Sequence, residues 1–215
     1  MYGDHGGDWV DERAKCVPTP GSASEHRLRA EEEWLRLHNA CEAALAVRVF
    51  RLAGIYGPGR SALDTVRRSL ISGGSILVTP SRHRGEAALA EAVAIARRSE
   101  GAGLRHVNRI HVDDICDALL ASMTLSGEPH PKPRVFNIAD NEPASRAEVM
   151  AYAAGLLGAT NQDAMAATHW GSDGARGRRR ASEHKRVDNT RMRAELLPHG
   201  LRYPTYREGL RGILT

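Results

Sequence analysis

The chain has 215 residues, a formal net charge of +4, 41% hydrophobic residues and 5% aromatic residues. This length is enough for one domain, or for one domain with a small appendage. The composition is that of a globular protein with an aliphatic core, and no apolar run approaches the length that spans a bilayer, so we expect no membrane partner.

The first half of the chain predicts four elements. A helix is expected over 25–39, with Ser22 or Ser24 as its N-cap. A strand over 46–53 and a helix over 62–72 follow, and the alanine-rich piece 86–98 is helical by propensity.

The second half continues to alternate between strands and helices, which predicts an α/β fold. Strands are expected over 109–112 and 134–139, with a helix over 113–124 between them. Ser145 and Thr205 each open a capping box with a Glu three residues later, and Asn189 is expected to cap a short helix. The polar stretch 159–184 is expected to be a mobile loop.

Cysteine usage and arginine placement exclude several kinds of site. Three cysteines (Cys16, Cys41 and Cys116) give an odd number without a Cys-x-x-Cys motif, which favours the cytoplasm or another reducing compartment. The densest arginine group lies at 176–180, in a Gly- and Ser-rich stretch. No aromatic residue is interleaved there for base stacking, so nucleic-acid binding is not expected, and a polyanion-binding segment over 176–193 is a weaker alternative.

The most informative stretch is 51–60, which reads RLAGIYGPGR. An apolar strand leads into Gly-x-x-Gly-Pro-Gly, a pattern that ends a strand abruptly in a loop. In open α/β sheets, ligands bind at the carboxyl ends of strands, where glycines let the backbone approach closely. A simple strand and tight turn without a ligand is the alternative interpretation.

This stretch resembles the loop after the sixth strand of extended short-chain dehydrogenase/reductases, the NAD-dependent epimerase/dehydratase family. Segments 106–115, 135–140, 185–189 and 201–210 resemble later parts of the same family. The closest resemblance is to an atypical branch without the family's Tyr/Lys pair. The resemblance implies the C-terminal part of a Rossmann-like, doubly wound parallel sheet with a small α/β substrate subdomain. The N-terminal Gly-rich βαβ half is then absent, and 1–215 is a partial NAD(P)-binding domain with a surface insertion at 76–105.

The same resemblance implies NAD or NADP as cofactor and a nucleotide sugar or other small polar metabolite as substrate. The residues expected to contact the cofactor are Ala53, Gly54, Ile55, Tyr56 and Tyr2. Those expected to contact the substrate are Arg60, Arg109 and His111. Tyr2 would lie near the nicotinamide in a complete nucleotide domain, and as a chain-terminal residue it is otherwise expected to be disordered.

No Tyr-x-x-x-Lys occurs in the sequence, so the catalytic residues are unknown and this chain is expected to be inactive by itself. A non-enzymatic module for nucleotide sensing or protein contact is the alternative. His111, Asp113 and Asp114 are weak metal candidates, because Asp113 is better explained as a helix N-cap; no metal is expected. Unpaired edges of the strand 46–53 are expected to make the chain self-associate.

Overall fold

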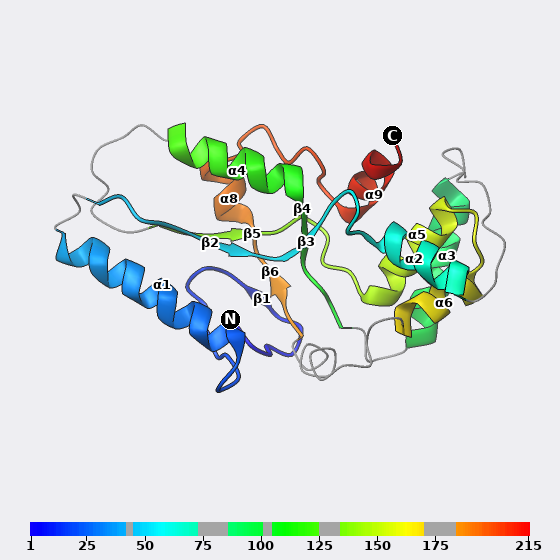
Figure 1. Ribbon diagram of the computed structural model, residues 1–215, viewed down its shortest axis with the longest axis horizontal. Coiled ribbons are helices and arrows are strands. Elements are labelled where there is room, and N and C mark those ends of the chain that lie inside the picture. The colour runs from blue at the N-terminus through cyan, green and yellow to red at the C-terminus, as the bar shows by residue number, and fades with distance from the viewer. Residues whose placement is uncertain (42–44, 73–85, 101–104, 125–133, 170–183) are drawn as a thin grey trace.

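The computed structural model describes residues 1–41, 45–72, 86–100, 105–124, 134–169 and 184–215. Its strands form three parallel pairs, and helices alternate with them along the chain. Figure 1 shows two parts: strands with their flanking helices on one side, and a group of helices on the other. The predicted α/β class with parallel strands is confirmed.

The longest strand pair is β2 (Arg48–Leu52) with β5 (Arg134–Ile138), in the register Arg48 to Arg134 through Leu52 to Ile138. In Figure 1 this pair runs between α1 (Ala23–Ala40) below and α4 (Val112–Thr124) above. The pair is therefore covered on both faces, as in a doubly wound fold. The rings of Phe50 and Phe136 stack at 5.8 Å across the pair.

Two shorter pairs extend this arrangement. β1 (Trp9–Val10) pairs with β6 (Arg186–Val187), and β3 (Gly54–Tyr56) pairs with β4 (Arg109–His111). The stretch after β2 thus continues as a second strand before the chain turns. The expected strand over 46–53 is confirmed as β2, and Gly54–Tyr56 is a further strand that was not expected.

The second part of the molecule is helical in the residues that the structure describes. It contains α2 (Ala62–Ser72), α3 (Glu86–Glu100), α5 (Arg146–Leu156) and α6 (Asn161–His169), joined by α9 (Tyr206–Leu214). The helix α8 (Thr190–Glu195) lies with the strands instead. Almost the whole of α5 is buried, so the other helices pack around it.

The predicted caps are confirmed for three helices. Ser22 accepts from the Glu25 amide, and Ser145 and Thr205 form capping boxes. Asn189 is the N-cap residue of α8 as predicted, but its side chain makes no capping hydrogen bond. Its amide donates instead to the carbonyl of Ala139 and the side chain of Asn141, both at 2.8 Å. The side chain of Asp188 accepts from the Thr190 amide at the start of α8 instead.

Two segments expected at the surface contribute to the core. Within 76–105, α3 buries Leu89 and Val93 against α5, so this helix is not a surface element. Within 159–184, Asn161–His169 is the helix α6, which buries Ala164 and Ala167. Alanine is small enough to let helices approach closely. The polar composition of 159–184 gave no indication that these alanines are part of the core. Whether 76–105 is an insertion stays a prediction, and 170–183 lies outside the described residues.

We expect Leu89→Ala to lower the free energy of unfolding by about 2–5 kcal/mol, because it removes a fully buried side chain between α3 and α5. Urea unfolding followed by circular dichroism measures this change. The matched control is Ile71→Ala on α2, whose side chain is 63% exposed, with an expected change within about 0.5 kcal/mol. Equal small effects of both substitutions would show that α3 is not part of the core.

Candidate functional site

The pairing of β3 with β4 brings most of the predicted site residues together. Gly54 lies opposite Arg109, Ile55 opposite Ile110 and Tyr56 opposite His111. The Gly54 amide also donates to the carbonyl of Asn108 at 3.0 Å. The residues expected to contact a cofactor and those expected to contact a substrate therefore lie on adjacent strands, beyond the carboxyl end of β2.

Glycines shape the turn that follows β3. The backbones of Gly57 and Arg60 exchange hydrogen bonds of 3.1 and 3.2 Å, and Gly59 has φ of +76°. A Cβ at Gly57 would come within 2.7 Å of the Val112 side chain, so this position must stay small for the turn to lie against the start of α4. Arg60 is exposed at the end of the turn.

His111 is buried between two tyrosine rings. The Tyr56 ring meets it edge-on at 5.2 Å, and the Tyr203 ring lies at 4.2 Å. The Asp113 amide donates to Nδ1 at 3.2 Å, which places the proton of the neutral ring on Nε2. Nε2 is buried and has no hydrogen-bond partner within the described ranges. Burial lowers the pKa of His111, so the ring is neutral at neutral pH.

The two acidic residues at the start of α4 have different roles. Asp113 lies within the first turn instead of capping it, 3.7 Å from a guanidinium nitrogen of Arg202. Asp114 is fully buried and accepts from the backbone amides of Arg202, at 2.6 Å, and Tyr203. Burial raises the pKa of Asp114 to about 6. Asp114 thus fastens the segment before α9 to α4.

The side chain of Arg109 forms hydrogen bonds with the backbone of the chain itself. Its guanidinium donates to the carbonyls of Val107 at 2.7 Å, Ala144 at 2.8 Å and Ser145 at 3.4 Å. Burial lowers its pKa. The guanidinium holds the loop before α5 against β4, and these bonds occupy the fork that was expected to bind a substrate group.

Asp140 follows β5 and lies next to Arg109. Its amide donates to the Arg109 carbonyl at 2.7 Å, and Oδ1 accepts from the Glu142 amide at 3.2 Å. Oδ2 is buried without a hydrogen-bond partner among the residues described. Burial raises the pKa of Asp140 to about 8, although Arg109 acts in the opposite direction.

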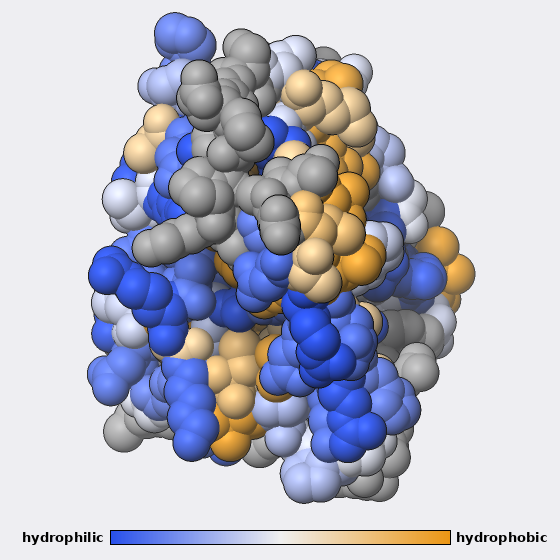
Figure 2. Space-filling view, turned by 90° about the vertical axis from the view of Figure 1, so that its left-hand side faces the viewer, coloured by the Kyte–Doolittle hydropathy of each residue, from blue (hydrophilic) through white to orange (hydrophobic). Residues whose placement is uncertain are grey.

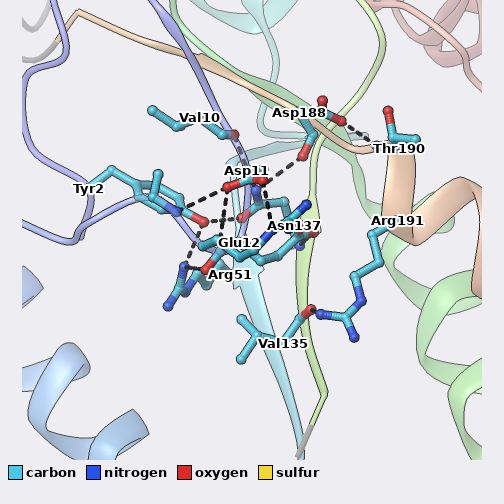
Figure 3. A network of polar contacts seen from close by, with 12 residues as sticks. Tyr2, Val10, Asp11, Glu12, Arg51, Val135, Asn137, Asp188, Thr190 and Arg191 are labelled. Carbon is cyan, nitrogen blue, oxygen red and sulfur yellow. Dashed lines mark hydrogen bonds and ion pairs between the residues drawn. The ribbon is translucent and has the colours of Figure 1, made fainter.

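Tyr2 is ordered and belongs to a separate polar network, which contradicts the expectation of a disordered terminus. Its side chain is 4% exposed. Figure 3 shows its hydroxyl between Asn137 and Arg51: it donates to Asn137 Oδ1 at 2.7 Å and accepts from Arg51 Nη1 at 2.6 Å. Arg51 makes a bidentate ion pair with Glu31 of α1. Burial lowers the pKa of Arg51, but its bonds to Glu31 and Tyr2 outweigh this and raise it overall.

Asn137 joins the strand pairs to one another. Besides accepting from Tyr2, its amide nitrogen donates to the carbonyls of Val10 in β1, at 3.4 Å, and of Asp188 after β6, at 3.1 Å. Its backbone amide donates to Glu12 Oε1 at 2.8 Å. Asn108 makes a similar link, donating to the Lys185 carbonyl and accepting from the Val187 amide.

Few polar groups of the predicted site are available to a ligand. The amides of Ala53 and Gly54 are bonded to Ile138 and Asn108. The Tyr56 hydroxyl points at the Thr205 carbonyl, 3.5 Å away, and a side chain at Gly209 would collide with it. Ile55, which is 40% exposed, and Arg60 present side chains to solvent.

Sequence reasoning missed Asn137, Asp114 and Asp140 as structural residues. The signal for Asn137 was a polar residue between Phe136 and Ile138 in a strand that is otherwise apolar at that end. Such a residue needs a buried partner. Nothing in the sequence identified the partners, which are separated from it by up to 135 residues.

Metal binding and membrane insertion find no support within the described residues. No three His, Cys, Asp or Glu side chains there are grouped so that they could hold a metal ion. No helix in that part of the chain is long and apolar enough to span a membrane. The arginine group at 176–180 falls outside the described ranges.

We expect Tyr2→Phe to lower the free energy of unfolding by about 1–3 kcal/mol, because it leaves the buried Asn137 oxygen without its donor. The control is Tyr203→Phe, since that hydroxyl makes no hydrogen bond among the described residues; its expected change is within about 0.5 kcal/mol. Urea titration measures both. An unchanged stability for Tyr2→Phe would mean that the network does not hold the fold together.

We expect the stability of the Asp140→Asn variant, relative to that of the unchanged protein, to increase as the pH rises. A folded-state pKa of about 8 lies above the ordinary value of 3.8, so the carboxyl's contribution to stability is full below about pH 4 and is lost as pH rises through about 8. The amide cannot ionise and avoids this loss. Melting temperatures at pH 5 and pH 9 measure the difference, with the exposed Asp8→Asn as control for the loss of one charge. A difference independent of pH would contradict the prediction.

No family model and no curated protein matches this chain. Among solved structures, a functionally unknown conserved protein from Silicibacter pomeroyi is similar, with 33% identity and a TM-score of 0.68 over 99% of this chain and 62% of that one. dTDP-glucose 4,6-dehydratase from Bacillus anthracis, in complex with NAD, has 20% identity and a TM-score of 0.60 over 99% and 57%. UDP-glucuronic acid 4-epimerase from Bacillus cereus, in complex with NAD, has 15% identity and a TM-score of 0.60 over 98% and 55%.

The chain thus spans between about half and two thirds of the length of these solved chains. The last two similarities are too low in identity to establish more than the fold. The chain has the α/β, Rossmann-like fold of the NAD-dependent epimerases and dehydratases.

Proposed function

We propose that this chain is part of an NAD(P)-dependent epimerase/dehydratase-like protein that takes a nucleotide sugar or another small polar metabolite. The observation that carries the proposal is the β3–β4 pair, which sets the expected cofactor segment Gly54–Tyr56 beside the expected substrate segment Arg109–His111. Both lie beyond the carboxyl end of a parallel strand, the usual ligand position in this class of fold. Fold-level similarity to NAD-bound nucleotide-sugar enzymes supports the same function.

The residues present fit the nicotinamide end of the cofactor better than its pyrophosphate. Gly54 has no side chain, and Ile55 offers an exposed apolar surface against which a flat ring can lie. A pyrophosphate needs a Gly-rich turn at a helix N-terminus, and no such turn after a strand is evident in this sequence. When bound, NAD would supply a hydride acceptor at this end. A role for Ala53 and Tyr56 is then to hold the backbone of β3 in place, through the Ile138 carbonyl and the His111 ring.

Turnover by this chain alone is not part of the proposal. The sequence has no Tyr-x-x-x-Lys, and α1 contains neither tyrosine nor lysine. His111 holds one proton on Nε2 but is buried between rings, and Asp140 is buried beside Arg109. None of these groups replaces a solvent-accessible acid/base pair, so we propose that the chain binds the nucleotide sugar without converting it.

Substrate contact in this proposal depends on Arg60. It is the one residue of the expected substrate set that is exposed; Arg109 supports the loop before α5, and His111 lies in the interior. A guanidinium at a glycine-rich turn suits the phosphates of a nucleotide sugar.

The thiols of Cys16, Cys41 and Cys116 are all free, which suits the proposed reducing compartment.

A non-enzymatic module for nucleotide sensing or protein contact is the second candidate. The observation that favours it is the structural use of Arg109 and Tyr2, whose polar groups are occupied by the chain itself. Retained cofactor binding without turnover would distinguish this module from the first candidate.

We expect UDP-glucuronic acid or dTDP-glucose to raise the melting temperature, and NADH and NADPH to leave it unchanged. A ligand at a hundred times its dissociation constant adds about 2.7 kcal/mol to the stability, which gives an easily measured shift. Arg60→Ala should reduce the nucleotide-sugar shift, whereas Arg36→Ala, an exposed arginine of α1, should not. Differential scanning fluorimetry and calorimetry measure both.

The outcomes separate the candidates. No shift with any nucleotide sugar would contradict the proposed substrate class. A shift with NADH or NADPH but not with a sugar would favour the sensing module. A nucleotide-sugar shift that is insensitive to Arg60→Ala would place the substrate elsewhere.

A further inference from the structure

His106 and His184 form a hydrogen-bonded pair outside the candidate site. Nδ1 of His106 lies 2.9 Å from Nε2 of His184, and the two rings are nearly parallel, with their centroids 5.2 Å apart. A hydrogen bond between two imidazole nitrogens needs one N–H group and one lone pair. Of the two nitrogens that face each other, one therefore carries a proton and the other does not.

His184 connects three separate segments of the chain. Its carbonyl accepts from the amides of His5, at 3.0 Å, and Gly7, at 2.9 Å, and its amide donates to Asp4 Oδ1 at 3.0 Å. Its ring contacts His106, which comes three residues before β4. A Cβ at Gly7 would come within 2.8 Å of this ring, so the N-terminal segment packs directly on the pair. The pair thus joins residues 4–7 and the beginning of β6 to the chain before β4, in the lower part of Figure 1.

A second link between β6 and the chain before β4 does not depend on protons. The side chain of Asn108 donates to the Lys185 carbonyl at 3.1 Å and accepts from the Val187 amide at 2.7 Å. An amide side chain does not titrate. Loss of the histidine contact would therefore free residues 4–7 and the beginning of β6, while Asn108 keeps the rest of β6 beside β4. Such an event is a local opening and not global unfolding.

The number of protons on the pair decides whether the contact forms. With both rings neutral, or with one added proton, one of the facing nitrogens still has a lone pair. With two added protons, both facing nitrogens carry N–H groups and both rings are positive, so the hydrogen bond is replaced by repulsion. Histidine takes up its proton between about pH 5 and pH 8 in ordinary surroundings. The contact is therefore lost in the mildly acidic range.

The charged groups around the pair favour one added proton over two. The Asp4 carboxylate interacts with His184 and Arg105, and the hydrogen bond from the His184 amide is the main cause that lowers the pKa of Asp4. One negative charge at this place supports one positive ring. The other titratable residues of the described segments around the pair are His5, Asp8, Lys185 and Arg186. The side chains of Lys185 and Arg186 donate to the carbonyls of Gly3 and Gly7, which places further positive charge in these segments.

We propose that the hydrogen bond between His106 and His184 is a pH-sensitive contact, which holds residues 4–7 and the beginning of β6 against the chain before β4. A second proton on the pair releases these segments. The change is confined to the neighbourhood of the β1–β6 pair, because Asn108 and the core of the helical part carry no group that titrates in this range.

Amides in place of the two imidazoles test the proposal. His106→Asn sets an amide where Nδ1 lies and His184→Gln sets one where Nε2 lies, so the double variant keeps a hydrogen bond that cannot take up protons. Between pH 6.5 and pH 5, we expect the folding equilibrium constant of the unchanged protein to fall about tenfold more than that of the double variant. The reason is that the unfolded chain binds one proton more than the closed pair. Urea titrations at the two pH values measure both constants.

Two exposed histidines provide the matched control. His26 belongs to α1, whose surface in the lower part of Figure 2 carries many hydrophilic side chains, and His199 follows α8. The double variant His26→Gln, His199→Gln removes the same number of imidazoles and should keep the pH dependence of the unchanged protein.

Hydrogen exchange on the unchanged protein locates the release. The amides of His5 and Gly7 donate to the His184 carbonyl, so we expect their protection factors to fall about tenfold between pH 6.5 and pH 5. The Val187 amide, bonded to Asn108, should keep its protection. Nitrogen NMR of the imidazoles measures the protons on the pair. The proposal is overturned by equal pH dependence of the unchanged protein and the Asn/Gln double variant, or by full protection of His5 and Gly7 when both rings are protonated.

Discussion

The side-chain amide of Asn137 is the contact on which the arrangement of the strands depends. It accepts from the Tyr2 hydroxyl and donates to a carbonyl of β1 and to one just after β6. A buried side-chain amide needs partners for both its N–H groups and its oxygen. Here the three hydrogen bonds are made to three different segments of the chain. Removing it would leave two carbonyls and a hydroxyl buried at the meeting point of two strand pairs. The position of β1 and β6 relative to β2 and β5 is therefore set by polar complementarity as much as by apolar burial.

Polar groups of the candidate site are likewise held in place by the chain itself, which makes them unavailable to a ligand. Arg109, Asp114 and Asp140 all lie on or beside β3 and β4, yet each is engaged with backbone or buried. Side chains that form hydrogen bonds with buried backbone carbonyls and amides are unavailable for substrate binding. The turn Gly57–Arg60 is the part of the site that remains open to solvent. Binding specificity in this part of the fold is expected to come from loops on a rigid frame.

Local elements could be predicted from the sequence, but the roles of most site residues could not. The helices at 62–72 and 206–214 follow from apolar periodicity and capping, which act within a few residues. The role of α3 was missed because its alanine-rich sequence has a weak apolar face, although Leu89 is fully buried. Arg109 was expected to bind substrate because a guanidinium can pair with phosphate or carboxylate groups. Its partners include the backbone carbonyls of Ala144 and Ser145, about 35 residues away. Contacts with backbone carbonyls cannot be predicted from the pattern of side chains in the sequence.

The pairing of β1 with β6 has a consequence for synthesis on the ribosome. Residues 9–10 leave the ribosome long before residues 186–187, and Tyr2 precedes Asn137 by 135 residues. The strand β1 therefore remains without its partner strand while the residues between 10 and 186 are made. At translation speeds of about 5–20 residues per second this interval lasts on the order of ten seconds or more. Until then β1 lacks its partner strand, and Tyr2 lacks Asn137 until that residue is made. A chaperone that shields short apolar segments would protect the chain from misassembly in this interval.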